Sequence, residues 1–471
     1  MSEISILESE LRAHLAPHLV LSDEHSKQFY GRDWIRDFVP APSLVVLPET
    51  VEQVQSIVTM CGRHGASLVP SGGRTGLSGG ATATRGEVVL SLERMRSVLE
   101  VNPIDRTIRC QAGVPLERIQ SEASQRELYF PVDFSSRGSA QVGGAISTNA
   151  GGIRVIRYGN MRDWVLGLKV VTGRAEILEL NGSLFKNNTG YDLRSLFIGA
   201  EGTLGIIVEA TLKLTTPPRD ATRVMCGLSG NDAILPLLTF CRGKLRDLSA
   251  FEFIDSTAFT EVIARRNLRN PLASMYSAYV LVECETNSAN AMERVAETFS
   301  EAHEKGLIAD AVVSESQAQS QELMNIRDLV SETLSQHYTL HKNDISVPVP
   351  AIPAFIQELS DSIEQAYGGF KVVIFGHIGD GNLHVNVLKP VHMSDHDFWK
   401  SCQESDRTIF STVRKYKGSV SAEHGVGLLK RDFLHYSRTA EEIEIMRGIK
   451  RVLDPLGIMN PGKVIPELPR M

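Results

Sequence analysis

Two histidines lie close together in a stretch that is rich in glycine and in turn-forming residues. The stretch G-H-I-G-D-G-N-L-H-V-N-V contains His377 and His384. Residues 372–376 and 383–387 have the composition of two strands joined by the turn Gly-Asp-Gly-Asn. Because side chains alternate across a strand, His384 and Asn386 should share one face, and His377 can lie beside His384. Two imidazoles that converge across a turn suit a zinc-like ion.

A carboxylate and a third histidine are adjacent further along the chain. Glu423 and His424 belong to the stretch S-A-E-H-G-V-G. Neighbouring side chains diverge on a regular helix, so both can reach one site only from a loop. A carboxylate would complete a three-ligand open metal site with the two earlier histidines. A single histidine is more often a satisfied core or surface residue, but the two motifs taken together favour a site.

Two cations are placed where they could bind an anion. Arg327 opens the stretch R-D-L-V-S, in which Ser331 follows one helical turn later on the same face. Lys342 stands in H-K-N-D-I-S-V-P, just before an expected strand at Ile345–Val349. An isolated Arg or Lys is usually a solvated surface charge. The alternative is a clamp for a carboxylate, which Arg can hold with two parallel hydrogen bonds.

Three glycine-rich segments occupy the first half of the chain. They are P-S-G-G-R-T-G-L-S-G-G at 70–80, V-G-G-A-I-S-T-N-A-G-G at 142–152 and I-G-A-E-G-T-L-G-I at 198–206. Glycine turns let backbone N–H groups approach phosphate oxygens closely. Each segment by itself is more simply a tight turn between strands. Three such segments together favour a large phosphate-bearing cofactor.

In their order and composition these segments resemble the FAD-binding domain of the vanillyl-alcohol oxidase/p-cresol methylhydroxylase superfamily. The resemblance implies that the first segment wraps the FAD pyrophosphate and that the later two surround the isoalloxazine and the ribityl chain. Some members attach FAD through a histidine in the first segment; residues 70–80 contain none, so noncovalent FAD is expected. The residues implied at the pyrophosphate are Gly72, Gly73, Arg74, Thr75, Gly76 and Gly79. Those implied around the flavin and ribityl chain are Gly143, Gly144, Thr148, Gly151, Gly152, Gly202, Thr203 and Ile206.

The two histidine motifs resemble the C-terminal domain of FAD-linked oxidases, a group that includes D-lactate, glycolate and D-2-hydroxyglutarate dehydrogenases. The resemblance implies that His377, His384 and Glu423 bind a divalent metal, for which two histidines and one carboxylate favour zinc. It also implies that His424 is the general base that takes the proton of a substrate hydroxyl.

The same resemblance favours the clamp reading for Arg327, Ser331 and Lys342, which would hold the carboxylate of a small 2-hydroxy acid. Many members carry Thr where this chain has Ser331, and the hydroxyl group is kept. Asn386, beside the metal face, is a further substrate-binding candidate.

The resemblance covers about residues 30 to 468 and is nearest to the D-2-hydroxyglutarate dehydrogenase branch at 33–34, 188–193 and 248–253. It implies oxidation of D-2-hydroxyglutarate to 2-oxoglutarate with hydride transfer to flavin N5. A D-lactate or glycolate dehydrogenase is the alternative, and a non-enzymatic metal-binding protein is a remote one. Electron-transfer flavoprotein or a quinone is the electron acceptor that the family implies, and a homodimer is its implied assembly.

The elements that must position these residues change in character along the chain. We expect an α+β fold with a two-subdomain FAD-binding domain at 1–221 and an α+β substrate-binding domain with an antiparallel sheet at 222–395. A mostly helical C-terminal segment at 396–471 should complete the active site and return to the flavin. A helix should start with Pro48-Glu49-Thr50, carry apolar positions from Val51 onward and end at Gly62 or Gly65. The clearest strands expected are Ala66–Pro70, Glu87–Leu92, Thr107–Cys110, Leu166–Val171, Gly205–Leu214, Ala250–Ile254, Ala278–Glu283 and Lys371–Gly376.

The length, charge and cysteine content of the chain limit the classes of protein to which it can belong. The 471 residues are too many for a single core. The 49 basic and 56 acidic side chains give a net charge of -7, which argues against nucleic acid as a partner. Six scattered cysteines without a C-x-x-C pair indicate free thiols. The acidic start does not resemble a signal or transit peptide, and no apolar run approaches the ~20 residues of a membrane span. A cytoplasmic enzyme without a membrane span is expected.

Overall fold

The computed structural model describes residues 3–286, 290–367 and 369–466. The chain divides into two compact units, each made of segments that are discontinuous in sequence. Unit 1 consists of Met1–Gly151, Asn160–Pro217 and Glu423–Met471. Unit 2 consists of Gly152–Gly159 and Pro218–Ala422.

Unit 1 is built on two β-sheets whose apolar faces contribute to one hydrophobic core. The smaller sheet contains, in spatial order, β1 (Val20–Leu21), β2 (Leu44–Val46), β4 (Val88–Ser91) and β3 (Leu68–Ser71). Its strand β4 pairs in parallel with both β2 and β3. The larger sheet is antiparallel and contains β5 (Val98–Asn102), β6 (Thr107–Gln111), β9 (Gly205–Lys213), β7 (Val165–Thr172) and β8 (Ile177–Leu180).

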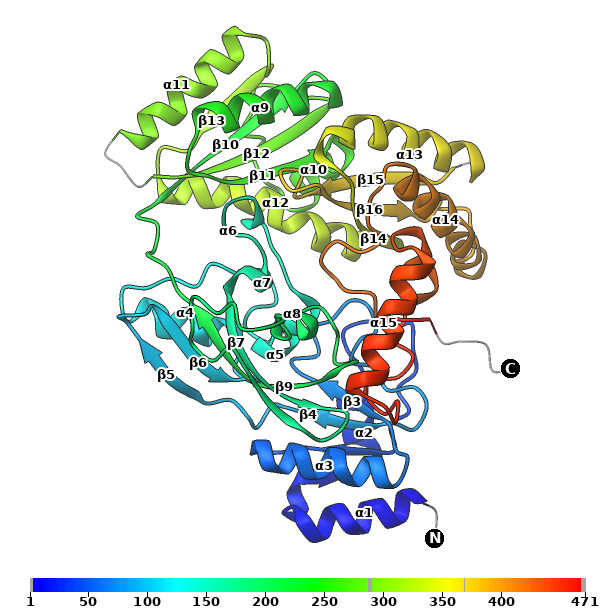
Figure 1. The fold of residues 1–471 in the computed structure, drawn as a ribbon. Helices are drawn as coiled ribbons and strands as arrows, with labels where there is room; N and C mark the ends of the chain where they lie inside the picture. The colour runs from blue at the N-terminus through cyan, green and yellow to red at the C-terminus, as the bar shows by residue number, and fades with distance from the viewer. Residues whose placement is uncertain (1–2, 287–289, 368, 467–471) are drawn as a thin grey trace. The chain divides into compact units, whose positions relative to one another are not determined.

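The helices of unit 1 pack on these sheets through single apolar faces. Helix α3 (Val51–Arg63) begins at Thr50, whose hydroxyl accepts the N–H of Gln53, and it buries Val54 and Ile57. Helix α1 (Glu3–His14) packs beside α3 (Figure 1). The other helices are α2 (Glu24–Tyr30), α4 (Leu116–Ser124), α5 (Val142–Thr148), α7 (Met161–Trp164), α8 (Arg194–Phe197) and α15 (Ala440–Leu453).

Unit 2 contains one seven-stranded sheet in which every pair of neighbouring strands is antiparallel. This confirms the antiparallel sheet expected from the sequence. The strands are, in spatial order, β13 (Asp310–Val313), β10 (Ala221–Leu228), β12 (Ala278–Glu285), β11 (Leu248–Asp255), β15 (Lys371–Gly376), β16 (Asn382–Leu388) and β14 (Leu340–Ser346).

Helices cover both faces of this sheet. Helices α9 (Ile234–Lys244) and α11 (Ala291–Glu304) lie on one side of β10–β13, and α10 (Ser256–Arg265) and α12 (Gln317–His337) lie on the other (Figure 1). Helix α13 (Ile352–Ala366) packs on β15 and α14 (Asp395–Lys415) on β14. The short helix α6 (Val155–Tyr158) contacts β11.

Two expectations about elements need correction. The segment 142–152 is not a loop between strands, because its first seven residues form α5 and bury Val142 and Ile146 in the core. The strand expected at Ile345–Val349 lies earlier, as β14, so Lys342 is within the strand rather than before it. The domain divisions at residues 221 and 395 stay predictions; in the division into compact units, 152–159 and 396–422 group with unit 2.

Within the described part of the chain, no helix combines the length and apolar character that crossing a membrane would require.

Candidate active site

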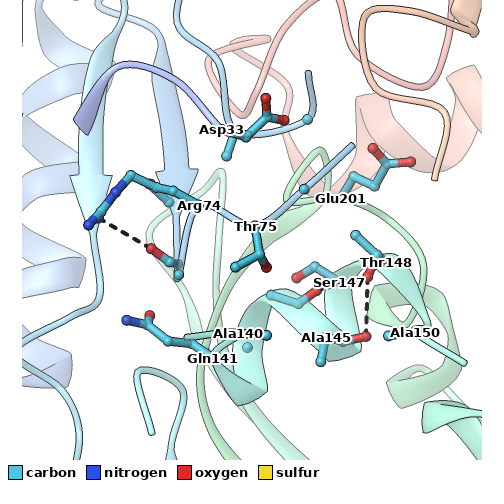
Figure 2. Close-up of a pocket in the computed structure, with 18 of the residues that line it drawn as sticks. Asp33, Arg74, Thr75, Ala140, Gln141, Ala145, Ser147, Thr148, Ala150 and Glu201 are labelled. Carbon is cyan, nitrogen blue, oxygen red and sulfur yellow. Dashed lines mark hydrogen bonds between the residues drawn. The ribbon is translucent and has the colours of Figure 1, made fainter. Parts of the chain in front are cut away.

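A large pocket in unit 1 is formed where the three glycine-rich segments meet. Eleven of the fourteen residues expected to bind FAD line it, from the loop after β3, from α5 and the residues after it, and from Gly202 and the start of β9. Figure 2 shows Thr75, Ser147 and Thr148 around this space. The lining residues among those expected are Gly72, Gly73, Arg74, Thr75, Gly76, Gly143, Gly144, Thr148, Gly151, Gly202 and Ile206.

The other three expected residues do not line the pocket. Gly79 has a φ of 76° and packs against Phe38 and Leu428. The buried Thr203 donates its hydroxyl hydrogen bond to the carbonyl of Ala200. Gly152 is the first residue of the segment that groups with unit 2. All fourteen residues stay predicted FAD contacts, and the eleven lining residues are those that border the pocket.

The pocket has features that fit a bound polar cofactor. Among the described residues, the side-chain atoms Ser71 Oγ and Gln141 Oε1 line it, are buried and have no hydrogen-bond partner. Buried polar atoms are normally hydrogen-bonded, so a ligand group would complete them. Gly144 borders the pocket, and a Cβ placed on it would have no atom within 4 Å. This open space beside a backbone is where a flat ring can approach closely.

Arg74 is held by neighbours in unit 1. Its guanidinium lies 4.4 Å from the centroid of the Phe29 ring and 4.8 Å from that of Tyr30. Its Nη1 lies 3.7 Å from a carboxylate oxygen of Glu93 and 3.5 Å from the carbonyl oxygen of Gly72. Cation–π contacts and an ion pair fix the guanidinium at the pocket wall, where it suits an anionic group.

Glu423 and His424 also line this pocket of unit 1. They lie in a stretch without helix or strand, as the sequence predicted for two adjacent functional side chains. Glu201, another lining residue (Figure 2), holds that stretch: its two carboxylate oxygens accept the N–H groups of Val426 at 2.7 Å and Gly427 at 2.9 Å. Burial raises the pKa of Glu201 to about 7, although the two N–H donors oppose the shift. Glu201 thus links the flavin segment to the histidine segment within one unit.

The two histidines of the metal motif come together in unit 2. His377 lies one residue beyond β15, and His384 lies on β16, which pairs with β15. Their ring centroids are 5.3 Å apart, with the ring planes at 85°. The turn between them is held by Asn382, whose amide donates to Asp344 Oδ1 at 2.8 Å. The hairpin expected from the sequence is therefore present, and it brings both imidazoles together.

Glu252 on β11 stands behind His377, and the sequence reasoning assigned it no role. The Nδ1 atom of His377 lies 2.9 Å from Oε1 and 2.8 Å from Oε2 of this fully buried carboxylate. Arg327 on α12 donates from Nε to the same Oε2 at 2.7 Å. Desolvation raises the pKa of Glu252, but His377 and Arg327 outweigh it and lower the pKa to about 2. The sequence feature that could have revealed this role is a charged residue inside the apolar strand L-S-A-F-E-F-I. A charge buried in such a strand must be paired.

Asp344 on β14 stands beside His384 and holds the chain that leads to Glu423. Its Oδ1 lies 3.6 Å from His384 Nδ1. Its Oδ2 accepts the N–H of Ala422, the last residue of unit 2, at 3.2 Å. Consecutive Cα atoms are about 3.8 Å apart. The backbone of Glu423 therefore starts next to Ala422 and the Asp344 carboxylate.

The predicted clamp residues lie on or against one face of α12. Arg327, Ser331 and Ser335 follow at intervals of one turn, and Lys342 Nζ donates to Ser335 Oγ at 2.8 Å. Desolvation lowers the pKa of Lys342. Ser331 is exposed, whereas Arg327 is buried and ion-paired to Glu252. Arg327 is thus not a solvated surface charge, and its role in the clamp stays a prediction.

Asn386 lies on β16 two residues after His384, so the two share one face of the strand as expected, and its role in substrate binding stays a prediction. It is buried, and its amide donates to the carbonyl oxygens of Val373 at 3.3 Å and His384 at 3.2 Å. It pairs with Lys342 across β14 and β16. These contacts give its amide nitrogen a structural role in the sheet.

Comparison with known proteins decides the family. Residues 217–464 match the family described as FAD linked oxidases, C-terminal domain, and residues 42–181 match an FAD binding domain. The chain belongs to the FAD-linked oxidase family. A D-2-hydroxyglutarate dehydrogenase of Stutzerimonas stutzeri (strain A1501) is 50% identical over 455 residues, covering 97% of this chain and 98% of that protein. The mitochondrial D-2-hydroxyglutarate dehydrogenase of Danio rerio is 34% identical over 456 residues, covering 96% and 84%.

Two solved structures have the same fold as this FAD-linked oxidase. A p-cresol methylhydroxylase with substrate bound has a TM-score of 0.78 at 15% identity, covering 98% of this chain and 97% of that one. A 4-ethylphenol oxidase from Gulosibacter chungangensis has a TM-score of 0.77 at 19% identity, covering 99% and 98%. At these identities the likeness concerns the fold alone, and it confirms the superfamily fold expected from the glycine segments. As an FAD-linked oxidase, the chain is an oxidoreductase that uses FAD.

Proposed function

We propose that this FAD-linked oxidase is a dehydrogenase that oxidises D-2-hydroxyglutarate to 2-oxoglutarate, with a divalent metal, preferably zinc, bound by His377, His384 and Glu423. The substrate follows from the relatives, which are named D-2-hydroxyglutarate dehydrogenases at identities up to 50% over nearly the whole chain. A D-lactate or glycolate dehydrogenase of the same family is the alternative.

The observation that carries the mechanism is the course of the chain from Ala422 to His424. Ala422 is hydrogen-bonded to Asp344, which stands beside His384 in unit 2. The next two residues, Glu423 and His424, line the pocket of unit 1 that fits FAD. A stretch of three residues thereby connects the histidine hairpin to the flavin pocket.

The residues present fit a metal ion of the zinc type. His377 Nδ1 is engaged by Glu252, which leaves its Nε2 for a ligand. His384 is close by, and Glu423 offers a carboxylate. A divalent metal, when bound, supplies a Lewis acid that lowers the pKa of a substrate hydroxyl. FAD, when bound, supplies a hydride acceptor at N5.

The protein's own residues bind and deprotonate the substrate. A ring nitrogen of His424 takes the proton of the 2-hydroxyl group as the C2–H bond breaks. The terminal nitrogens of the Arg327 guanidinium, of which Nη2 lies 3.4 Å from His377 Nδ1, bind substrate carboxylate together with the Ser331 hydroxyl and the Lys342 ammonium, from one face of α12. The oxidised product is a 2-keto acid. The two electrons removed from the substrate would leave to an external acceptor, for which electron-transfer flavoprotein and a quinone are our candidates.

The test is anaerobic mixing of the purified protein with D-2-hydroxyglutarate while the flavin absorbance is followed. Fast bleaching is expected with this acid and slow or no bleaching with D-lactate, glycolate or L-2-hydroxyglutarate. Dialysis against a chelator should abolish bleaching, and added zinc should restore it. Bleaching by D-lactate or glycolate in preference would replace the substrate, and bleaching that survives complete metal removal would remove the metal from the mechanism.

A further inference from the structure

Glu252 is the one carboxylate that contacts both a predicted metal ligand and a predicted substrate cation among the described residues. Its oxygens lie 2.8 and 2.9 Å from His377 Nδ1, and one of them accepts Arg327 Nε at 2.7 Å. All three side chains are buried, and Glu252 is completely inaccessible. They come from β11, α12 and the residue after β15, so that three separate elements meet at this carboxylate.

The contacts of Glu252 determine which ring nitrogen of His377 carries a hydrogen. A carboxylate accepts hydrogen bonds and cannot donate them, so the Nδ1 atom that faces it must carry the hydrogen. In the neutral imidazole the lone pair is then on Nε2, which is the atom left for a metal. The same carboxylate occupies the Nε edge of Arg327 and thereby orients the two terminal nitrogens of the guanidinium. The Arg327 carbon also lies 5.2 Å from the centroid of the Phe375 ring, which limits its movement further.

We propose that Glu252 is a positioning residue that sets the tautomer of His377 and the orientation of Arg327, and so ties metal binding to substrate-carboxylate binding. This inference rests on the proposed function, because it takes His377 as a metal ligand and Arg327 as a substrate contact. Neither the family motifs nor the sequence pattern assigned Glu252 a role.

Glu252→Gln changes the chemistry with little change in shape. The oxygen that accepts from Arg327 Nε, Oε2, also lies 2.8 Å from His377 Nδ1, so an amide oxygen there can serve both donors, but an amide nitrogen in place of Oε1 puts a donor 2.9 Å from Nδ1. The variant therefore loses the charge and the second acceptor that favour hydrogen on Nδ1, and it stabilises the tautomer with hydrogen on Nε2, which is the wrong one for metal binding. We expect zinc to bind about 10- to 100-fold more weakly, as is typical when a residue behind a metal ligand is lost.

The chain offers a matched control in Glu283 on the neighbouring strand. Glu283 is also fully buried and also binds two arginines, Arg154 at 2.7 Å and Arg223 at 2.7 Å. It pairs in register with Ala250, two residues from Glu252. In the part of the chain that the structure describes, none of the hydrogen bonds of Glu283 involves a histidine. Glu283→Gln should therefore lower the stability of the protein without changing its affinity for the metal.

The experiment compares wild type, Glu252→Gln, Glu252→Asp and Glu283→Gln as flavin-loaded proteins. Zinc content is measured after dialysis against graded chelator concentrations, and kcat and KM are measured at saturating zinc. We expect weaker zinc binding and a raised KM in Glu252→Gln, and intermediate values in Glu252→Asp, which keeps the charge but shortens the side chain. Glu283→Gln should match the wild type in zinc affinity and KM even if its melting temperature falls.

The outcomes separate the two claims. Wild-type protein that retains no zinc would overturn both the metal in the proposed function and this inference. Wild type that binds zinc, with Glu252→Gln binding it equally tightly at unchanged KM, would overturn the inference alone. If Glu252→Gln does not fold, Glu252→Asp decides: zinc affinity and KM equal to those of Glu283→Gln would contradict the role of Glu252.

Discussion

Glu201, Glu252 and Asp344 are buried carboxylates that bind the residues next to or within the predicted catalytic motifs. Each has its oxygen atoms engaged by N–H donors: backbone groups at Glu201, the Ala422 backbone and the Asn382 amide at Asp344, and Arg327 and His377 at Glu252. Removing a buried charge's partner is costly, and hydrogen bonds to charged groups are stronger than neutral ones. At the scale of the residue, the supporting carboxylates should therefore be as sensitive to substitution as the side chains they hold.

His424 is the side chain whose loss should affect the chemical step most directly. In His424→Asn the amide keeps a polar group of similar reach but cannot take up the substrate proton. General acid–base catalysis contributes about 10²- to 10⁴-fold, so kcat should fall by that factor. Stopped-flow measurement of flavin reduction gives this rate, while flavin and zinc content should stay at the wild-type level. The control is His396→Asn, because the His396 side chain is 88% exposed on α14. A kcat near that of wild type in His424→Asn would contradict the assignment of the base.

At the scale of the element, the stretch that carries Glu423 and His424 has no helix or strand to fix it. Gly425 and Gly427 have φ values of 81° and 50°, and a Cβ on Gly427 would lie 2.1 Å from the carbonyl oxygen of Ser78. Leu428 donates its N–H to that same carbonyl at 2.9 Å. Left-handed backbone and this close approach both require glycine. The stretch is thus held by the segment after β3 and by Glu201.

Glu201 should make the stability of this arrangement depend on pH. Burial raises its pKa in the folded protein to about 7 from the ordinary value of 4.5. Its stabilising contribution is therefore fully present below pH 4.5 and is lost as the pH rises through about 7. Glu201→Gln is neutral at every pH and removes this dependence. We expect the melting temperature of the variant, relative to wild type, to increase as the pH is raised from 5 to 8.

The melting-temperature difference between variant and wild type at pH 5 is the internal reference. At this pH Glu201 is mostly uncharged in the folded wild type, as Gln is in the variant, so the difference reports only the pH-independent effect of replacing the carboxyl group with an amide. The flavin-reduction rate gives a second readout. The ionised carboxylate accepts two backbone N–H groups, whereas an amide oxygen is the one acceptor of Gln, so the variant should be slower above pH 7. A melting-temperature difference that stays constant from pH 5 to 8 would show that Glu201 does not titrate in this range.

At the scale of the whole molecule, the features that the sequence could not predict are ion pairs between residues far apart in the chain. The histidine hairpin was predictable because His377 and His384 are seven residues apart and joined by one turn. Glu252 meets His377 across 125 residues, and no local pattern reveals such a contact. Likewise, Arg154 binds Glu283 across 129 residues and helps to place 152–159 in unit 2. Motifs, sheet type and most strand positions followed from local patterns, whereas the supporting residues and unit boundaries did not.

Cofactor binding should stabilise the whole molecule, and Gly144 provides a way to test where FAD lies. A ligand that binds only the folded protein at 100 times its Kd adds about 2.7 kcal/mol to the free energy of unfolding. FAD added to the apoprotein should therefore raise its melting temperature. Gly144→Val puts a side chain into the open space of the pocket, so the apoprotein should fold while the FAD-dependent rise is lost.

Gly243→Val on α9 is the matched control for this last substitution. Gly243 is also within a helix with no atom near its added Cβ, but it lies outside the pocket, so the FAD-dependent rise should persist. Acid precipitation of the wild-type holoprotein should leave all flavin in the supernatant, because the first glycine segment offers no histidine for attachment. Flavin that remains with the precipitate would demonstrate covalent attachment. An unchanged FAD response in Gly144→Val would move the flavin away from α5.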